Sequence, residues 1–239
     1  MVKELLSHQS PELCLKKKKM KTITQNLQTL KSSLEDKPHI DIVIVTKTRL
    51  PKEVEEAIEA GAKSIGENRV QEAEQKFPKI NNIDKVEKRL IGRLQSNKAK
   101  KAVKIFDTID SVDSLRLSQK ISKAAESIGK RQRVLLQINS SGEDKKAGFK
   151  LSEKNEILEC INMPGIQVEG LMTMGPNTKD AHLIAESFKK TKKLFDELKE
   201  IEGINIKTLS MGMSGDYQIA VCEGSTSIRV GTAVFGPRG

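Results

Sequence analysis

The alternation of short apolar runs with longer amphipathic ones is the feature that most constrains how this chain can fold. From residue 40 onward there are eight strand candidates, most of them apolar at consecutive positions, β-branched and bounded by Gly, Asn, Ser or Pro. Such runs are typical of strands that are buried on both faces of a parallel sheet. We expect strands at residues 39–47, 62–66, 89–92, 106–112, 133–139, 166–173, 206–212 and 226–236.

The segments between these runs carry helix signals. Residues 51–61 begin with Pro51 in the first turn and stop at a glycine, and residues 113–129 and 180–203 also end at a glycine. Residues 21–35 predict one more helix before the first strand. The helices expected after strands two and three, at 68–76 and 96–104, are short and weakly patterned.

Eight strands that alternate with helices over about 200 residues predict an α/β fold, a single-domain (β/α)8 TIM barrel with an extra N-terminal helix. The alternative is an open, doubly wound sheet. We expect the barrel domain to span residues 20–239. Residues 1–19 hold few apolar residues and four consecutive lysines, and are expected to form a disordered basic N-terminal extension.

The charge of the chain is concentrated in two places. The chain has 42 Lys and Arg against 32 Asp and Glu, a net charge of +10. Most of the excess lies in residues 1–22 and 84–104, so the remainder is close to neutral. With one Tyr and no Trp, the sequence lacks aromatics for a base-stacking platform, and we expect no nucleic-acid partner.

Cysteine spacing and hydropathy indicate the class of protein. Cys14, Cys160 and Cys222 are far apart and odd in number, which fits neither a metal site nor a disulfide framework. We therefore expect no bound metal and a reducing, cytoplasmic setting. No apolar run approaches the roughly 20 residues of a membrane helix, and no membrane association is expected.

The strand assignment predicts where the chemistry lies, because barrel active sites occur at the C-terminal ends of the strands. Lys47 follows the apolar run "DIVIV", where partial desolvation favours a neutral amine able to form a Schiff base. The alternative is a lysine whose stem packs while its ammonium stays in water. Arg229 lies inside the last strand and needs an acceptor, either a carboxylate such as Asp216 or Glu223, or a ligand's ring nitrogen or phosphate.

The last two predicted strands also favour an anion site. Gly212, Gly215, Gly231 and Gly236 occur there beside Ser210, Ser214 and Thr232, which together supply close backbone approach and hydroxyl donors. Loops after strands seven and eight often hold phosphate in barrels. A second cationic group could bind an anion or form a solvated face: Lys98, Lys100, Lys101 and Lys104.

Seven segments in order, from about residue 40 to the end, resemble one family. They are "VIVTKTR", "IGENRVQE", "LIGRLQSNKAK", "IDSVDSL", "VLLQINSSGEDKKAGF", "VEGLMTMGP" and "LSMGMSGDYQIAVCEGSTSIRVGTAVFGPR". They are similar to those of the pyridoxal 5′-phosphate homeostasis proteins, the YggS or PROSC family, whose fold resembles the N-terminal barrel of alanine racemases. One departure is Arg89, where the family often has histidine.

The resemblance implies a cofactor and its contacts. Lys47 would carry pyridoxal 5′-phosphate (PLP) covalently as an internal aldimine, and Arg229 would face the pyridine nitrogen and keep it unprotonated. The other implied cofactor-binding residues hold the phosphate, flank it or line the ring pocket: Asn68, Met172, Ser210, Met211, Ser214, Gly231 and Thr232.

The family implies a protein that binds and buffers the cofactor in vitamin B6 homeostasis without turnover, so no catalytic residue is assigned. PLP-dependent apo-enzymes would be recipients, and we expect a monomer or weak dimer. The alternative is a PLP-dependent enzyme such as an amino-acid racemase. A racemase needs a second base across the ring, which alanine racemases take from a second domain, and the only tyrosine here is Tyr217.

Overall fold

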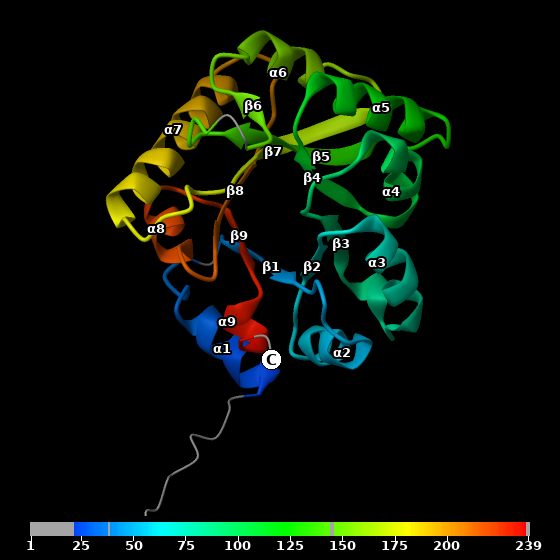
Figure 1. Cartoon of the computed structure of the whole chain (residues 1–239), viewed down its shortest axis with the longest axis vertical. Coiled ribbons are helices and arrows are strands. Elements are labelled where there is room, and N and C mark those ends of the chain that lie inside the picture. The colour runs from blue at the N-terminus through cyan, green and yellow to red at the C-terminus, as the bar shows by residue number, and fades with distance from the viewer. Residues whose placement is uncertain (1–21, 38, 144–145, 238–239) are drawn as a thin grey trace, which may run out of the picture.

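The computed structural model describes residues 22–37, 39–143 and 146–237, and within them the chain forms a closed barrel (Figure 1). Each barrel strand is parallel to both of its neighbours, and the pairs β1–β9 and β4–β5 complete the ring. The barrel strands are β1 Asp41–Val45, β2 Ser64–Glu67, β3 Glu87–Leu90, β4 Thr108–Val112, β5 Gln132–Asn139, β7 Ile166–Thr173, β8 Thr208–Met213 and β9 Ser227–Val230. The predicted (β/α)8 architecture is confirmed, and the open sheet is excluded.

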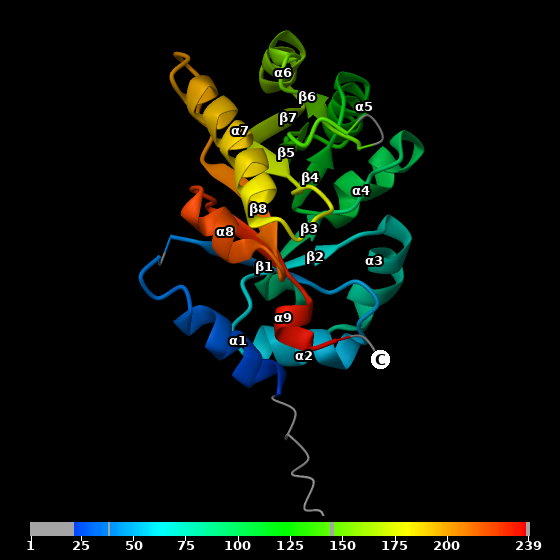
Figure 2. The same ribbon diagram turned by 60° about the vertical axis from the view of Figure 1, so that its left-hand side comes forward.

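Helices surround the strands on the outside of the ring, as Figures 1 and 2 show. They are α1 Ile23–Ser32, α2 Pro51–Glu59, α3 Val70–Lys76, α4 Ala99–Ile105, α5 Leu115–Glu126, α6 Lys154–Ile161, α7 Ala181–Lys199, α8 Tyr217–Cys222 and α9 Thr232–Phe235. Short 3-10 turns are η1 Phe77–Lys79, η2 Ile83–Lys85 and η3 Ser96–Lys98. Among the residues described, no helix combines the length and apolarity that a membrane crossing requires.

Local signals explain where the longer helices begin and which face they bury. The hydroxyl of Ser114 accepts a hydrogen bond from the Leu117 amide at the start of α5, and Asp180 caps α7 in the same way. Along α5, the buried positions include Leu117 and Ile121, one turn apart. These faces pack on the outer side of the strands and form most of the hydrophobic core.

The predicted N-terminal helix is present as α1, and it covers the seam between the first and last strands. The last helix, α9, has only four residues and is too short to shield β9 alone. Leu27 and Leu30 of α1 therefore pack in one buried cluster with Ile44 and Ile228. A hydrogen bond of 2.8 Å from the Asn26 side-chain amide to the Val234 carbonyl ties α1 to α9.

Two expectations about the strands need correction. The last strand was expected to span 226–236, but β9 ends at Val230, and the amides of Val234 and Phe235 turn back to the Gly231 carbonyl. The apolar run continues through this turn, and periodicity alone cannot separate a short strand from a short helix. A two-residue strand, β6 Phe149–Lys150, pairs with β5 and was not predicted. The expected extension, residues 1–19, lies outside the described residues.

Charged side chains fill part of the barrel interior. Arg89 of β3 lies 3.0 Å from Asp110 of β4 and 3.0 Å from Glu87, which also pairs with Arg133 of β5 at 2.9 Å. Asp110 is fully buried and Arg89 nearly so. Burial alone would lower the pKa of Arg89, but Asp110 and Glu87 outweigh it and hold that pKa above its usual value. The arginine in place of the family's frequent histidine is therefore a buried ion-pair partner.

We predict that Arg89→Met destabilises the barrel, because it leaves the buried Asp110 carboxylate without its ion-pair partner. Breaking a buried pair from one side costs about 3 to 5 kcal/mol, or about 10 °C in Tm for a chain of this length. Thermal unfolding followed by circular dichroism measures the change. The matched control is Arg116→Met on the exposed side of α5, expected to change stability by no more than about 0.5 kcal/mol. Equal melting of the two variants would contradict the structural role of Arg89.

Candidate functional site

A cavity of about 280 Å³ opens where the strands end, at the mouth of the barrel. Its walls come from the segments that follow β1, β2, β3, β7, β8 and β9. Its volume is near the lower end of ligand pockets in proteins, which begin at about 300 Å³. The lining residues are Val45, Lys47, Arg49, Asn68, Ile91, Met174, Met213, Ser214, Gly215, Arg229, Gly231 and Thr232.

The electrostatic character of the mouth cavity follows from that set of residues. Three cations, Lys47, Arg49 and Arg229, line it, and none of the described lining residues is a carboxylate. A concave site with one sign of charge attracts ligands of the opposite sign. Nowhere in the described ranges do three or more His, Cys, Asp or Glu side chains form a group that could hold a metal ion. The cavity therefore favours an organic anion.

The pairing of β1 with β9 brings Lys47 and Arg229 to the same cavity. Arg229 lies opposite Val43 of β1 in the parallel register, and Lys47 follows just past the end of that strand. Strand β1 ends at Val45. Val45 and Lys47 both line the cavity. Residues 182 positions apart in the sequence thus share one site.

Arg229 is buried without an ion-pair partner among the described residues. Its Nη1 donates to the Ser210 hydroxyl at 2.6 Å and carbonyl at 2.9 Å, and its Nη2 donates to the Thr173 carbonyl at 2.8 Å. The carboxylate partners considered from the sequence, Asp216 and Glu223, make no such bond to it. Burial lowers the pKa of Arg229 to about 10, so the side chain is still charged at neutral pH.

Arg229 keeps hydrogen-bonding capacity for a ligand. A guanidinium has five N–H donors, and the three bonds to Ser210 and Thr173 use three of them. The other two, including Nε–H, have no acceptor in the part of the chain that the structure describes, and the side chain lines the mouth cavity. Asp110 and Asp216 attract the Arg229 charge without contacting it, so a ligand atom with a lone pair could still accept from an unused N–H donor.

The loop after β8 is tied to the turn after β9. The Ser214 hydroxyl accepts hydrogen bonds from the amides of Gly231 and Ala233, each at 3.2 Å. Gly212 lies near the end of β8 with φ of 95°, and a side-chain Cβ there would lie 2.7 Å from the Ala220 side chain of α8. A Cβ on Gly231 would lie 3.3 Å from the Val45 carbonyl, so glycine keeps this part of the wall open.

Most of the sequence-predicted site residues meet at this cavity. Six of the nine line it: Lys47, Asn68, Ser214, Arg229, Gly231 and Thr232. Ser210 and Met172 are buried in β8 and β7, and Ser210 contacts Arg229 rather than the cavity. The side chain of Met211 alternates with Ser210 along β8 and packs in the hydrophobic core, so it does not face the cavity.

Several lining residues were not in the predicted set. Arg49 is one, and it also holds the wall together: its Nη2 donates to the Gly236 carbonyl at 3.0 Å and its guanidinium lies 5.0 Å from the Phe235 ring centroid. Its signal in the sequence is a cation two residues after Lys47. Met174, Met213 and Ile91 are apolar residues at strand ends, and nothing in their spacing separates them from core residues.

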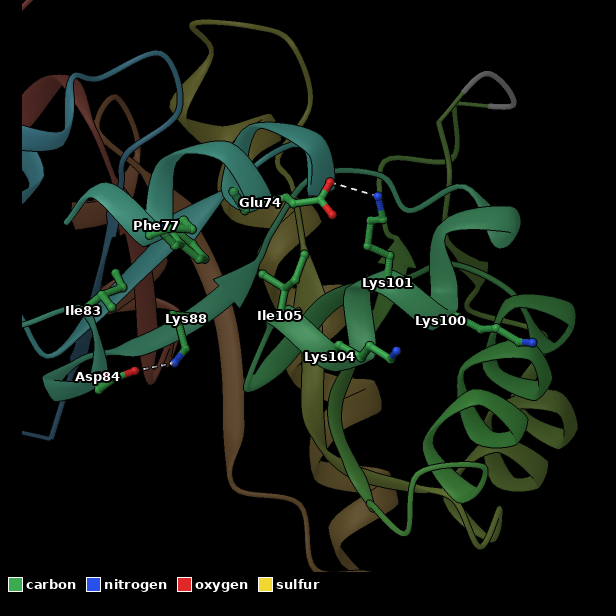
Figure 3. Close-up of a pocket in the computed structure, with 11 residues that line it drawn as sticks. Glu74, Phe77, Ile83, Asp84, Lys88, Lys100, Lys101, Lys104 and Ile105 are labelled. Carbon is green, nitrogen blue, oxygen red and sulfur yellow. Dashed lines mark hydrogen bonds and ion pairs between the residues drawn. The ribbon is translucent and has the colours of Figure 1, made fainter.

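A larger cavity, of about 660 Å³, lies on the outside of the barrel between α3 and α4 (Figure 3). Lys100, Lys101 and Lys104 border it, three of the four lysines considered as an anion site. Lys101 is paired with Glu74 at 2.9 Å. The residues that line this outer cavity include none from the carboxyl end of a strand. This cavity does not contain any of the nine predicted site residues.

The amino-acid sequence is similar to one protein family and to several individual proteins. The family described as "Alanine racemase, N-terminal domain" matches residues 19–239. The pyridoxal phosphate homeostasis protein of Synechocystis is 37% identical over 205 residues, 84% of this chain and 93% of that protein. Its counterpart in Escherichia coli is 34% identical over 202 residues, 83% of this chain and 86% of that protein.

Solved structures give the same grouping. PipY of Synechococcus elongatus, solved without PLP and with PLP bound, is 34% identical and superposes with TM-scores of 0.85 and 0.83. Each match covers 90% of this chain and all of PipY. Alanine racemase of Clostridium difficile is 24% identical with a TM-score of 0.74, and 56% of it is covered. That likeness concerns the fold alone.

We predict that Arg229→Met costs less stability than Arg89→Met in the protein without ligand. Removing Arg229 takes away a charge that burial disfavours, leaves the Ser210 and Thr173 acceptors without their donor and removes a longer-range attraction to Asp110 and Asp216 but no direct ion pair, which costs about 1 to 3 kcal/mol. Removing Arg89 instead leaves the buried Asp110 carboxylate without its ion-pair partner. Thermal unfolding of the two variants side by side measures the difference. If Arg229→Met melted at the same temperature as Arg89→Met or below it, the main role of Arg229 would be to stabilise the fold and not to bind a ligand.

Proposed function

The chain belongs to the family of the pyridoxal phosphate homeostasis proteins, and we propose that its barrel mouth holds pyridoxal 5′-phosphate for intracellular PLP homeostasis. The observation that carries the proposal is the meeting of Lys47, Arg229 and Ser214 at one cation-lined cavity. An aromatic aldehyde with a phosphate group fits such a cavity in charge and in the kinds of donor it offers. The 34% identical PipY, which is fully covered, has been solved with PLP bound.

We propose that Lys47 holds the cofactor covalently, as a Schiff base between its Nζ and the cofactor aldehyde. The cofactor supplies that aldehyde and an electron-withdrawing ring. Lys47 follows the apolar strand β1, and the apolar side chains of Val45 and Ile91 line the same cavity. A lysine amine in its neutral form is the nucleophile that attacks a carbonyl carbon.

The proposed phosphate contacts come from the last two strand ends. Ser214, Gly231 and Thr232 lie together, and the Ser214 hydroxyl fixes the turn at Gly231. Gly231 leaves room for a ligand to approach the backbone, and Thr232 adds a hydroxyl donor. Asn68 is proposed to lie beside the ring, with Met172 behind the wall of the cavity.

Arg229 is proposed to donate to the ring nitrogen of the cofactor. Its charge and its unused N–H groups favour an unprotonated nitrogen, because a pyridinium would place two cations together. Ser210 holds the guanidinium in place through its hydroxyl and carbonyl. An unprotonated ring is a weaker electron sink, which suits storage of the cofactor better than amino-acid chemistry.

The proposed role is therefore binding and release without turnover. Tyr217, the only tyrosine and the second base that the racemase alternative would need, begins α8 and lies 3.4 Å from the Ser33 hydroxyl. It does not line the mouth cavity. We further propose PLP-dependent apo-enzymes as recipients, a monomer or weak dimer, and a cytoplasmic setting. The free thiols of Cys160 and Cys222 agree with a reducing compartment.

We predict that Lys47→Ala abolishes the yellow absorbance band of the PLP-loaded protein, while the barrel still folds. A half-buried lysine at a strand end contributes little packing, so the stability change is about 0.5 kcal/mol. Borohydride reduction followed by peptide mapping identifies the labelled lysine. The control Lys52→Ala changes an exposed lysine of α2 and keeps the band. A label found only on another lysine would refute the assignment.

We also predict that the loaded protein does not exchange the α-hydrogen of amino acids. Arg229 beside the ring nitrogen weakens carbanion stabilisation, and no tyrosine reaches the cavity as a second base. Incubation with L-alanine in deuterated water is expected to give no D-alanine and no α-deuterium above the rate of free PLP. Sustained label uptake that disappears in Lys47→Ala would make the protein an enzyme.

A further inference from the structure

A buried ion-pair network lies directly behind Lys47. Nζ of Lys76, at the end of α3, is 2.8 Å from Oε1 of Glu67 and 2.7 Å from Oε1 of Glu72. The Lys76 side chain is 8% exposed and that of Glu67 is fully buried. The Thr46 hydroxyl donates to the same Glu67 oxygen at 2.7 Å. These contacts join α3 to the ends of β1 and β2.

The network reaches both peptide groups that flank the Cα of Lys47. On one side, Nζ of Lys76 donates to the Thr46 carbonyl at 2.9 Å. On the other side, the Thr48 amide donates to Oε1 of Glu72 at 2.6 Å. Because one residue, Lys76, contacts both the carbonyl and that carboxylate, the two peptide planes around Lys47 are held by a single rigid unit.

This arrangement includes two features that are unfavourable for stability. Thr48 has φ of 62°, a left-handed conformation that is unfavourable for a β-branched residue. Oε2 of Glu67 is buried and has no hydrogen-bond partner among the described residues. Burial raises the pKa of Glu67 despite the hydrogen bond from Lys76. Strain and buried charge of this kind persist where they organise a site.

The carboxylate that holds the Thr48 amide is ionised at neutral pH. Burial opposes ionisation of Glu72, but the hydrogen bonds from Lys76 and from the Thr48 amide outweigh burial and lower its pKa. Because the pKa of Glu72 is lowered, its carboxylate is ionised at every pH above the range in which a glutamate ordinarily titrates. The charged acceptor for the Thr48 amide is therefore present there. The backbone at Lys47 is therefore restrained under physiological conditions.

We propose that Glu67, Glu72 and Lys76 form a positioning network that fixes the backbone at Lys47 and directs its amine into the mouth cavity. The inference rests on the proposed function of Lys47. In this proposal Glu67, Glu72 and Lys76 affect the rate at which Lys47 captures the aldehyde. They do not affect how tightly the phosphate and the ring are bound. A displacement of about 1 Å at a reacting group can cost about 100-fold in rate.

Glu72 offers the sharpest test, since its side chain is partly exposed, whereas those of Glu67 and Lys76 are buried. Glu72→Gln keeps an oxygen that accepts from the Thr48 amide, whereas Glu72→Ala removes it. Glu74→Ala, two residues along α3 and paired with Lys101 on the outside, is the matched control. Each variant is mixed rapidly with PLP, and the rate constant for formation of the borohydride-reducible band is measured by absorbance.

Two further readouts separate positioning from general damage. Pyridoxine 5′-phosphate, which lacks the aldehyde, reports binding of ring and phosphate through its Kd. Hydrogen exchange of the Thr48 amide in the ligand-free protein reports the restraint itself. For Glu72→Ala we expect capture at least about 10-fold slower, faster exchange at Thr48, and a Kd within about 2-fold of wild type. Glu72→Gln and Glu74→Ala are expected to capture PLP within about 2-fold of the wild-type rate.

The outcomes distinguish the two proposals. If the wild-type protein forms no reducible adduct on Lys47, the proposed function is wrong, and this inference falls with it. If the wild type forms the adduct and Glu72→Ala captures PLP equally fast, only the positioning network is wrong. A parallel loss of pyridoxine 5′-phosphate affinity and of capture rate in Glu72→Ala would also overturn it, because the whole pocket would then depend on Glu72.

Discussion

The hydrogen-bonded seam between β1 and β9 is the constraint on which the rest of the site depends. Closing a parallel sheet into a barrel brings the first and last strands together and puts all their carboxyl ends on one rim. Lys47 and Arg229 meet only because of that closure. The helix α1 protects the seam from outside, where the short α9 leaves apolar surface of β1 and β9 uncovered. Closure of the barrel between β1 and β9 is thus a condition for forming the site.

Two buried arginines of the barrel interior illustrate different uses of the same side chain. Arg89 is surrounded by carboxylates, which keep it charged and make it part of the fold. Arg229 contacts only carbonyl and hydroxyl oxygens, and burial lowers its pKa. A cation that is held in place by neutral acceptors, with no carboxylate in direct contact among the described residues, is available to a ligand. This contrast supports a binding role for Arg229.

Much of the fold could be predicted from the sequence, because parallel strands leave a local signal. Each buried strand is a short run of β-branched residues, and the end of "DIVIV" identified Lys47 as a strand-end lysine. The turn after β9 could not be predicted, since "TAVF" suits a strand as well as one helical turn. The role of Lys76 was also hidden. On α3 it looks like a surface lysine, and only the tertiary contact with the end of β1 shows that it is buried.

The central claim is that the mouth of this barrel, and not the larger outer cavity, holds the cofactor through Lys47. A crystal structure of the full-length protein grown with pyridoxal 5′-phosphate tests it most directly. We predict continuous electron density from Nζ of Lys47 to the cofactor, with the Arg229 guanidinium facing the ring nitrogen and the phosphate beside Ser214. Cofactor density on another lysine, such as Lys100 or Lys104 at the outer cavity, with an empty barrel mouth, would contradict it.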